Sequence, residues 1–244
     1  MFTVASEPAM VSAKRAMNVA NNSSPPVQPD GPATKRLKRG LSVQEIQMAE
    51  AQERCDFRSN IPANFHPHEV LLKMMAKKGV NAVSRSYSEL KGFFHKPSQD
   101  EINAYNFEVL RAVRGADIEF LQKYHSEGNS LNICNRFGES VLHLACRKQL
   151  VSVVDFLLNV AGVPVRVCDD YGRTPMHDAC WTSEPNFEVV DLILDKCPDL
   201  LLVKDKRGHT PLFYARREHW AKWLRHLGRN ISRALPRDEV MALP

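Results

Sequence analysis

The chain has 244 residues, of which 43% are hydrophobic and 25% are charged, with a formal net charge of +5. This composition supports a buried core and excludes disorder throughout. It contains no run of about 18 apolar residues, which excludes a transmembrane helix. Because the N-terminus has no apolar secretory-signal core, we expect the six cysteines to be reduced, in the cytosol or nucleus.

Residues 1–40 are predicted to be a disordered basic tail. They include NNSSPPVQPDGPA, whose few large apolar side chains cannot offset the entropy of ordering. A basic cluster fits a nuclear import signal in an accessible tail, and a solvated linker is the alternative. We favour import to the nucleus, with the cytoplasm as the other location. The cluster consists of Lys35, Arg36, Lys38 and Arg39.

Residues 41–99 are predicted to form a helical extension. A capping box opens at Ser42, at the head of SVQEIQMAEAQERC. A second helix is expected from near Pro67 to Gly79, with apolar side chains on one face. The segment YSELKGFF that follows is compatible with a short helix. The sequence leaves open whether this extension docks on the rest of the chain.

The sequence then repeats itself at intervals of 34 and 36 residues. The blocks NRFGESVLHLAC (135–146), DDYGRTPMHDAC (169–180) and DKRGHTPLFYAR (205–216) align, and each leads into an apolar helix. Such a period indicates stacked helix pairs. Glycine suits a turn with positive φ, and Thr followed by Pro suits a helix start. The structural residues of the motif are Gly138, His143, Gly172, Thr174, Pro175, His177, Gly208, Thr210 and Pro211.

The blocks resemble the ankyrin repeat, whose core is D-x-x-G-x-T-P-L-H-x-A. The middle block matches best, with Met176 in the Leu position, whereas the last block has Phe213 in the His position. A capping box at Ser98 opens a helical pattern up to Gly115, and residues 100–134 resemble a fourth, capping repeat. The resemblance implies an all-α ankyrin solenoid with β-hairpin-like tips over 100–230, in repeats 100–134, 135–168, 169–204 and 205–230, followed by a C-terminal tail, 231–244.

Two local patterns raise the possibility of chemistry. His143 with Cys146, and His177 with Cys180, have the residue types and spacing of zinc ligands. The repeat explains the same spacing without metal, and the resemblance implies that these histidines bond turn groups. Cys180 with His177 also suggests a thiol nucleophile, but Cys180 is predicted on a buried helix face, where thiols are inert. We favour no cofactor, no metal and no enzyme; a zinc or thiol enzyme is the least favoured hypothesis.

The resemblance implies a non-catalytic scaffold or adaptor that binds another protein through the concave groove and the hairpin tips. Trp181, in an enlarged loop that ends at Asn186, is the strongest candidate; its alternative is a tryptophan that covers a neighbour. Trp220 and Trp223 are assigned to packing. The candidate partner-binding residues are Arg136, Phe137, Leu144, Arg147, Lys148, Tyr171, Arg173, Asp178, Trp181, Lys206, Arg207, His209 and Tyr214.

Charge along the repeats is uneven. Residues 169–203 carry eight acidic and two basic side chains, and residues 204–228 carry seven basic and two acidic ones. A polar end on the terminal repeat accounts for this, and we favour that explanation. The alternative is a basic end that binds an acidic partner or nucleic acid, which makes a nucleic-acid-associated regulatory factor the second hypothesis. We expect a monomer that does not bind membranes.

Overall fold

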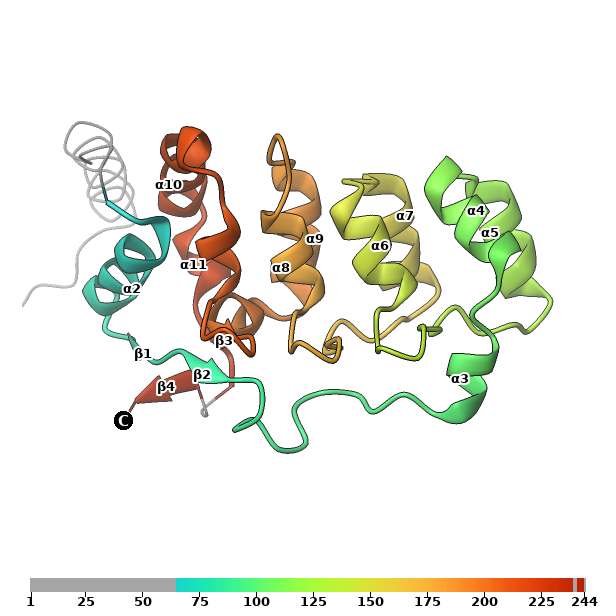
Figure 1. Cartoon of the computed structure of the whole chain (residues 1–244). Coiled ribbons are helices and arrows are strands. Elements are labelled where there is room, and N and C mark those ends of the chain that lie inside the picture. Colours follow the sequence, from blue (N-terminus) through green and yellow to red (C-terminus); the bar gives the residue numbers. More distant parts are fainter. Residues whose placement is uncertain (1–64, 239–240, 244) are drawn as a thin grey trace, which may run out of the picture. The chain divides into compact units, whose positions relative to one another are not determined.

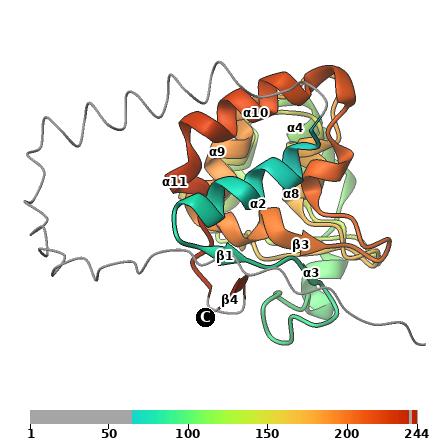
Figure 2. The same ribbon diagram turned by 90° about the vertical axis from the view of Figure 1, so that its left-hand side faces the viewer.

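The computed structural model describes residues 65–238 and 241–243. The predicted tail, the basic cluster at 35–39 and the helix predicted from Ser42 lie outside these residues, so they stay predictions. Within the described residues, helices stand side by side in a row of pairs (Figure 1). Figure 2 looks along this row from the end at which residues 67–77 lie. No helix among residues 65–238 and 241–243 is long and apolar enough to cross a membrane.

Each predicted repeat forms one pair of this row. The first helix of each pair packs on the first helix of the next, and the second helices of the two central pairs also pack together, which gives two layers. The pairs are α4 (Phe107–Gly115) with α5 (Ile118–Ser126), α6 (Val141–Arg147) with α7 (Val151–Asp155) and its π-helical continuation η1 (Phe156–Val160), α8 (Pro175–Cys180) with α9 (Phe187–Lys196), and η3 (Pro211–Tyr214) with η4 (Arg217–His219) and α10 (Trp220–Arg229).

One apolar core runs through all the pairs. The second helices supply bulky side chains such as Leu157 and Ile193, and the first helices supply smaller ones such as Ala145 and Ala179; all four are fully buried. Burying a side chain of the larger kind stabilises the fold by about 1.5–3 kcal/mol. Since each pair leaves an apolar face that only its neighbour covers, the stack is stable as a whole rather than pair by pair.

Two histidines join consecutive repeats, as the motif predicts. His143 Nδ1 lies 2.9 Å from Ser140 Oγ, and His177 Nδ1 lies 2.9 Å from Thr174 Oγ1. The other ring nitrogen, Nε2, reaches a carbonyl oxygen of the next repeat, at 3.0 Å for His143 and 3.2 Å for His177. Burial lowers the pKa of His177 to about 4, so this ring is neutral at pH 7. A neutral imidazole accepts at one nitrogen and donates at the other, which both bonds require.

The helix predicted from Ser98 to Gly115 is divided in two. The capping box of Ser98 and Glu101 is present and opens α3 (Gln99–Asn103), but the helix ends there. Asn106 has extended backbone angles, and its side chain accepts a hydrogen bond from the Val109 N–H at 2.9 Å, so it caps a new helix, α4. The expectation of one helical run up to Gly115 was therefore wrong at residues 104–106.

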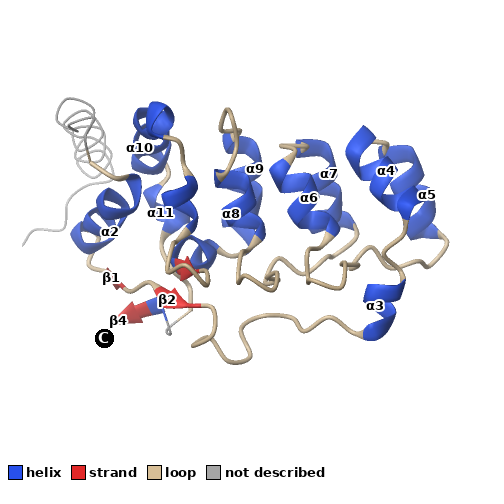
Figure 3. Cartoon of the chain, viewed as in Figure 1, coloured by secondary structure: helices blue, strands red, loops and turns tan. Residues whose placement is uncertain are grey.

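The predicted helical extension is helical only in part. Among residues 65–98 the structure has one helix, α2 (Pro67–Lys77), and Gly79 has a φ of +82° just beyond its end, as predicted. YSELKGFF forms turns rather than a helix. Residues 80–98, which we call the strap, run beneath the row of helices from α2 to α3 as an extended chain with turns (Figures 1 and 3).

Short strands and backbone bonds tie the strap to the repeats. β1 (Asn81–Ala82) pairs antiparallel with β4 (Ala242–Leu243), and β2 (Arg85–Ser86) pairs in parallel with β3 (Val203–Lys204). Further along, the His95 N–H donates to the carbonyl of Arg166 at 2.8 Å. At the other end, α2 packs against α10, α11 (Ile231–Ala234) and η3. An N-terminal helix therefore covers the C-terminal end of the stack.

A candidate partner-binding surface

The last repeat differs at its first helix from the two preceding repeats, which carry the motif histidine, and α2 compensates for the difference. Phe213 stands where the motif has histidine, and η3 is a short 3₁₀-helix without a side-chain cap. His68 from α2 supplies the missing imidazole: its Nδ1 lies 3.0 Å from Thr210 Oγ1, and its Nε2 lies 3.1 Å from Ser84 Oγ in the strap. Burial, together with His66 and Lys204, lowers the pKa of His68 to about 4, so this ring is also neutral.

The start of α2 also brings His66 to a set of aromatic rings, on the side of the stack formed by the first helices. The ring of His66 stacks on Phe213 with 4.1 Å between centroids, and His209 stacks on the same ring at 5.5 Å. Tyr214 lies 6.0 Å from His209 and 6.1 Å from Trp181. These five residues form a continuous series of ring contacts that we call the aromatic row: His66, Trp181, His209, Phe213 and Tyr214.

Much of the aromatic row is open to solvent. Trp181 is 50% exposed and Phe213 is 44% exposed. Isolated exposed apolar side chains are ordinary, but neighbouring exposed aromatic rings on one face are typical of interaction sites. The exposed rings of the aromatic row, which include Trp181, therefore form a candidate interaction site.

Cationic side chains border the aromatic row. Lys206 and Arg207 stand exposed on the hairpin that carries His209, while Arg216 and Arg217 follow Tyr214 and are also exposed. We call these four residues the basic rim: Lys206, Arg207, Arg216 and Arg217.

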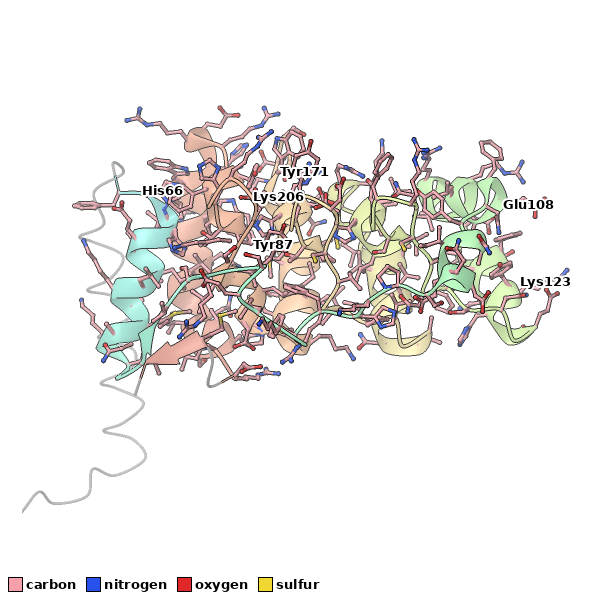
Figure 4. The ribbon with its side chains drawn as sticks, turned by 60° about the horizontal axis from the view of Figure 1, so that its bottom comes forward. His66, Tyr87, Glu108, Lys123, Tyr171 and Lys206 are labelled. Carbon is pink, nitrogen blue, oxygen red and sulfur yellow. The ribbon has the colours of Figure 1, made fainter. Side chains whose placement is uncertain are left out.

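The neighbouring hairpin tip adds another aromatic ring. Tyr171 is 50% exposed, with Lys206 at 5.3 Å and Arg173 at 5.4 Å from its ring centre. Figure 4 shows His66, Lys206 and Tyr171 on the same part of the molecule, away from Glu108 and Lys123.

This tip is held in place by its own turn and by the strap. The Asp169 carboxylate accepts hydrogen bonds from the backbone N–H groups of Tyr171 at 2.9 Å and Arg173 at 2.8 Å. Gly172 has a φ of +73° and lies so close to the strap that an added Cβ would be 2.3 Å from Tyr87 Cδ1. The strap therefore supports the tip without covering Tyr171.

Tyr214 and Trp181 are also fixed by specific contacts. The Tyr214 hydroxyl donates to Asp205, and burial together with this bond raises the pKa of Tyr214 to about 12. The enlarged loop after Trp181 is fastened at both sides. The Asn186 N–H donates to Gln149 Oε1 at 2.7 Å, and His219 Nε2 lies 2.6 Å from the Ser183 carbonyl oxygen. These hydrogen bonds fix the loop that follows Trp181.

The structure brings seven of the predicted partner-binding residues to one region and separates the others. Those at the aromatic row, the rim or the adjacent tip are Tyr171, Arg173, Trp181, Lys206, Arg207, His209 and Tyr214. Arg136 and Phe137 form their own exposed pair on an earlier tip, with 4.7 Å from the guanidinium to the ring centre. Lys148 is exposed beyond α6, while Arg147 is half-buried and paired with Glu139.

Two predicted outward positions were wrong. Leu144 is 8% exposed and Asp178 is 4% exposed, so neither presents its side chain to a partner. Leu144 belongs to the core cluster. Asp178 lies under the half-buried Arg147 of the preceding repeat, 3.9 Å from its Nη1, and burial raises the pKa of its carboxyl. The first helices are packed between two neighbours, which leaves less of their surface free than an isolated helix would have.

Sequence reasoning missed three contributors. His66 was not considered, Phe213 was treated as a departure from the motif, and Trp220 was assigned to packing. In the structure Trp220 is half-buried beside the row, 4.9 Å from the His66 ring, whereas Trp223 is buried as expected. The available signal was the missing histidine of the last repeat, which implied an unusual surface at that position.

The two chemical alternatives gain no support from the geometry. Cys180 is buried as predicted, and burial raises the pKa of its thiol well above its ordinary value. His177, its supposed base, is engaged with Thr174 and the next repeat. Within the part of the chain that the structure describes, no group of three or more His, Cys, Asp or Glu side chains is placed to hold a metal ion.

Comparison with known proteins agrees with the repeat architecture. Residues 109–200 match the family model described as ankyrin repeats (3 copies). The chain contains an ankyrin-repeat domain. Its fold is an all-α ankyrin solenoid, and ankyrin repeats are protein–protein interaction modules that are generally non-catalytic.

Several relatives share part of this ankyrin-repeat chain. The human SMC5-SMC6 complex localization factor protein 1 is 38% identical over 78 residues, which is 32% of this chain and 7% of that protein. A putative glutaminase 2 of Caenorhabditis elegans is 32% identical over 71 residues, 29% of this chain and 12% of that protein. The probable 26S proteasome regulatory subunit p28 of Saccharomyces cerevisiae is 26% identical over 152 residues, 62% of this chain and 60% of that protein. In each case the match covers less than two thirds of the relative.

Proposed function

We propose that this ankyrin-repeat protein is a non-catalytic adaptor that binds another protein through the aromatic row and the tip of Tyr171. The supporting observation is the series of ring contacts from His66 to Trp181, bordered by exposed cations. Aromatic and arginine side chains carry a large share of the binding energy at protein interfaces. Because the turns, the loop and α2 hold these side chains, little ordering cost would oppose binding.

A comparative pull-down tests this function. The full chain carrying Tyr171→Ala, Trp181→Ala and Arg207→Ala is compared with wild type, after circular dichroism confirms that it is folded. A matched control places the same number of substitutions elsewhere, at Phe107 and Arg111, exposed on α4, and at Val160 in the following pair. We expect specific partners to be lost from the first variant and kept by the control. Unchanged partners in the first variant would refute the function.

We further propose that the protein acts in the nucleus. The basic cluster from Lys35 to Arg39 supports this location. The name of the human relative, a localization factor for the SMC5-SMC6 complex, is compatible with it, although only 7% of that protein is matched. A fluorescent fusion with alanine at all four cluster positions should lose nuclear enrichment. The control changes Lys14 and Arg15 to alanine, and equal loss in the control would contradict the assignment.

The basic rim also gives the nucleic-acid hypothesis a specific observation. Lys206 and Arg207 have no ion pair within residues 65–238 and 241–243, so their charge is available to a phosphate backbone or to carboxylates. If nucleic acid is the ligand, labelled single- or double-stranded DNA or RNA will bind at low salt, with an affinity that falls steeply as salt rises. We favour a protein partner because exposed rings accompany the charges on this face, and absence of binding at low salt would remove the alternative.

A further inference from the structure

The described chain begins at the aromatic row. Residue 65 directly precedes His66, whose ring stacks on Phe213 at 4.1 Å and lies 4.9 Å from Trp220. His66 is fixed there because its ring accepts the N–H of His68 as the cap of α2. Whatever precedes Phe65 in the sequence therefore starts beside the row rather than at a distant part of the molecule.

The surface at this point combines exposed rings with positive charge. Arg216 pairs with Glu218 at 3.7 Å, whereas Lys206 and Arg207 have no ion pair within the residues that the structure describes. Lys206 lies over Tyr171, and Arg217 lies over Trp220 at 5.9 Å. The closest acidic group of the hairpin, Asp205, is buried and already accepts bonds from the Tyr214 hydroxyl and two backbone N–H groups. Glu184, an exposed carboxylate of the loop after Trp181, is paired with Lys222. Glu188 and Asp195 belong to the second helix of their pair, where they line a shallow hollow. An acidic segment with apolar side chains would complement the row.

The sequence places such a segment shortly before the described residues. Residues 42–57, SVQEIQMAEAQERCDF, hold four acidic side chains and one basic one, whereas residues 1–41 hold two acidic and six basic side chains. The segment is the one for which a capping box predicts a helix. At 3.6 residues per turn, Ile46, Glu50, Glu53 and Phe57 fall on one face. A face that mixes carboxylates with apolar groups suits a surface that mixes cations with rings.

The connection favours this segment over a separate molecule as occupant. Seven residues, 58–64, join it to Phe65, and a chain of that length spans up to roughly 25 Å when extended. A short tether of this kind gives an effective concentration of about millimolar, which lets even a weak contact form. Neither a second copy of the chain nor an unrelated acidic peptide has this advantage at ordinary protein concentrations.

We propose that residues 42–57 dock on the aromatic row as an acidic helix and compete there with the protein partner. This inference rests on the proposed function, since it assigns an internal occupant to the same surface. Occupation by the segment would weaken the apparent affinity for the partner in proportion to the fraction of molecules in which the row is free. The segment would then set the threshold for partner binding.

The docking itself is tested with a nitroxide label on Cys55 of the full chain. Four of the other cysteines are buried, and Cys168, which is half-buried, is replaced by serine. We expect the label to broaden the indole N–H signals of Trp181 and Trp220. Glu50→Gln with Glu53→Gln should remove the broadening, whereas Gln44→Lys with Gln52→Lys, which changes the net charge equally on the opposite face, should keep it.

Three results would overturn the proposal. The first is no broadening in the labelled wild type, and the second is broadening that the Glu50→Gln and Glu53→Gln changes leave intact. For the third, an isotope-labelled chain without nitroxide is mixed with a chain that bears the nitroxide. Broadening of the isotope-labelled signals in this mixture would assign the contact to a second copy. Adding labelled nucleic acid completes the series: tight binding that displaces the segment would assign the surface to nucleic acid, and that would also overturn it.

Partner recovery separates this inference from the function on which it rests. If both hold, Glu50→Gln with Glu53→Gln increases partner recovery, about twofold where the segment covers the row half of the time. If recovery falls with Trp181→Ala but is unchanged by the two glutamines, the function stands and the docking fails. If the nitroxide contact is present but Trp181→Ala changes no partner, the docking stands and the proposed function fails.

Discussion

Replacing His68 by alanine tests whether α2 is an integral part of the last repeat. Thr210 is fully buried, and its hydroxyl has one partner among the described residues, His68 Nδ1 at 3.0 Å. The substitution leaves this hydroxyl without a partner, which costs about 1–3 kcal/mol. We therefore expect the free energy of unfolding to fall by about 2 kcal/mol. In a domain of this size, that loss lowers the melting temperature by roughly 4–8 °C.

The assay is a double-mutant cycle between His68→Ala and Thr210→Val, measured by urea denaturation. If the hydrogen bond carries the cost, His68→Ala is less damaging once the hydroxyl is gone, with a coupling of about 1 kcal/mol or more. Lys77→Ala, at an exposed position of the same helix, should change stability by less than about 0.5 kcal/mol. A coupling below about 0.5 kcal/mol would refute the explanation.

A second substitution, Phe213→His, should restore stability to the His68→Ala protein. Phe213→His restores the residue that the motif has at this position and gives Thr210 a local partner, as His177 gives Thr174 in the preceding repeat. In the His68→Ala background it should recover part of the lost stability. In the wild type, where Thr210 already has its bond, it should bring no gain.

Two further predictions concern the buried histidines and the glycines of the turns. Both His68 and His177 have a pKa of about 4 in the folded chain, below the 6.5 of the free ring. As the pH falls, protons therefore bind these rings in the unfolded chain before they bind them in the folded chain. The free energy of unfolding should be constant above pH 6.5 and fall towards pH 4, by up to about 3 kcal/mol per ring in denaturant titrations. A flat profile would contradict this. Gly172→Ala should cost about 1–3 kcal/mol more than Gly208→Ala, because both have left-handed φ but only the former meets Tyr87. In the Tyr87→Ala background the two glycine substitutions should cost the same. Equal costs in the chain that keeps Tyr87 would show that the strap makes no close steric contact with the tip.

The repeats were predictable because their signals are local. A glycine with positive φ, a Thr-Pro helix start and an apolar second helix each act within a few residues, and all recur at the same spacing. The positions of Gly138, Gly172 and Gly208 confirm this, with φ of +78°, +73° and +78°. The Nδ1 bonds of His143 and His177 follow for the same reason, since each ring reaches a cap three residues away.

The place of α2 was not predictable from such signals. The bond between His68 and Thr210 joins residues 142 positions apart, and no periodicity links them. The strap likewise has no periodic pattern of its own. Besides the local turns of residues 86–93, it is held by backbone bonds to the distant residues Arg166, Lys204 and Met241. The candidate site was therefore predicted in its repeat-borne part, Trp181 and Tyr214, and missed in the part that α2 contributes, His66.

The affinity of the recovered partner for the Trp181→Ala protein shows whether the aromatic row is the binding surface. Trp181 is half exposed and its loop is held by other residues, so the substitution should leave stability nearly unchanged. If the aromatic row is the binding surface, we expect a loss of about 2 kcal/mol, roughly a 30-fold weaker Kd. Phe107→Ala, which removes a ring exposed on α4, should leave the Kd unchanged. Equal affinities for the wild type and Trp181→Ala proteins, or equal losses for the two variants, would show that the partner binds elsewhere.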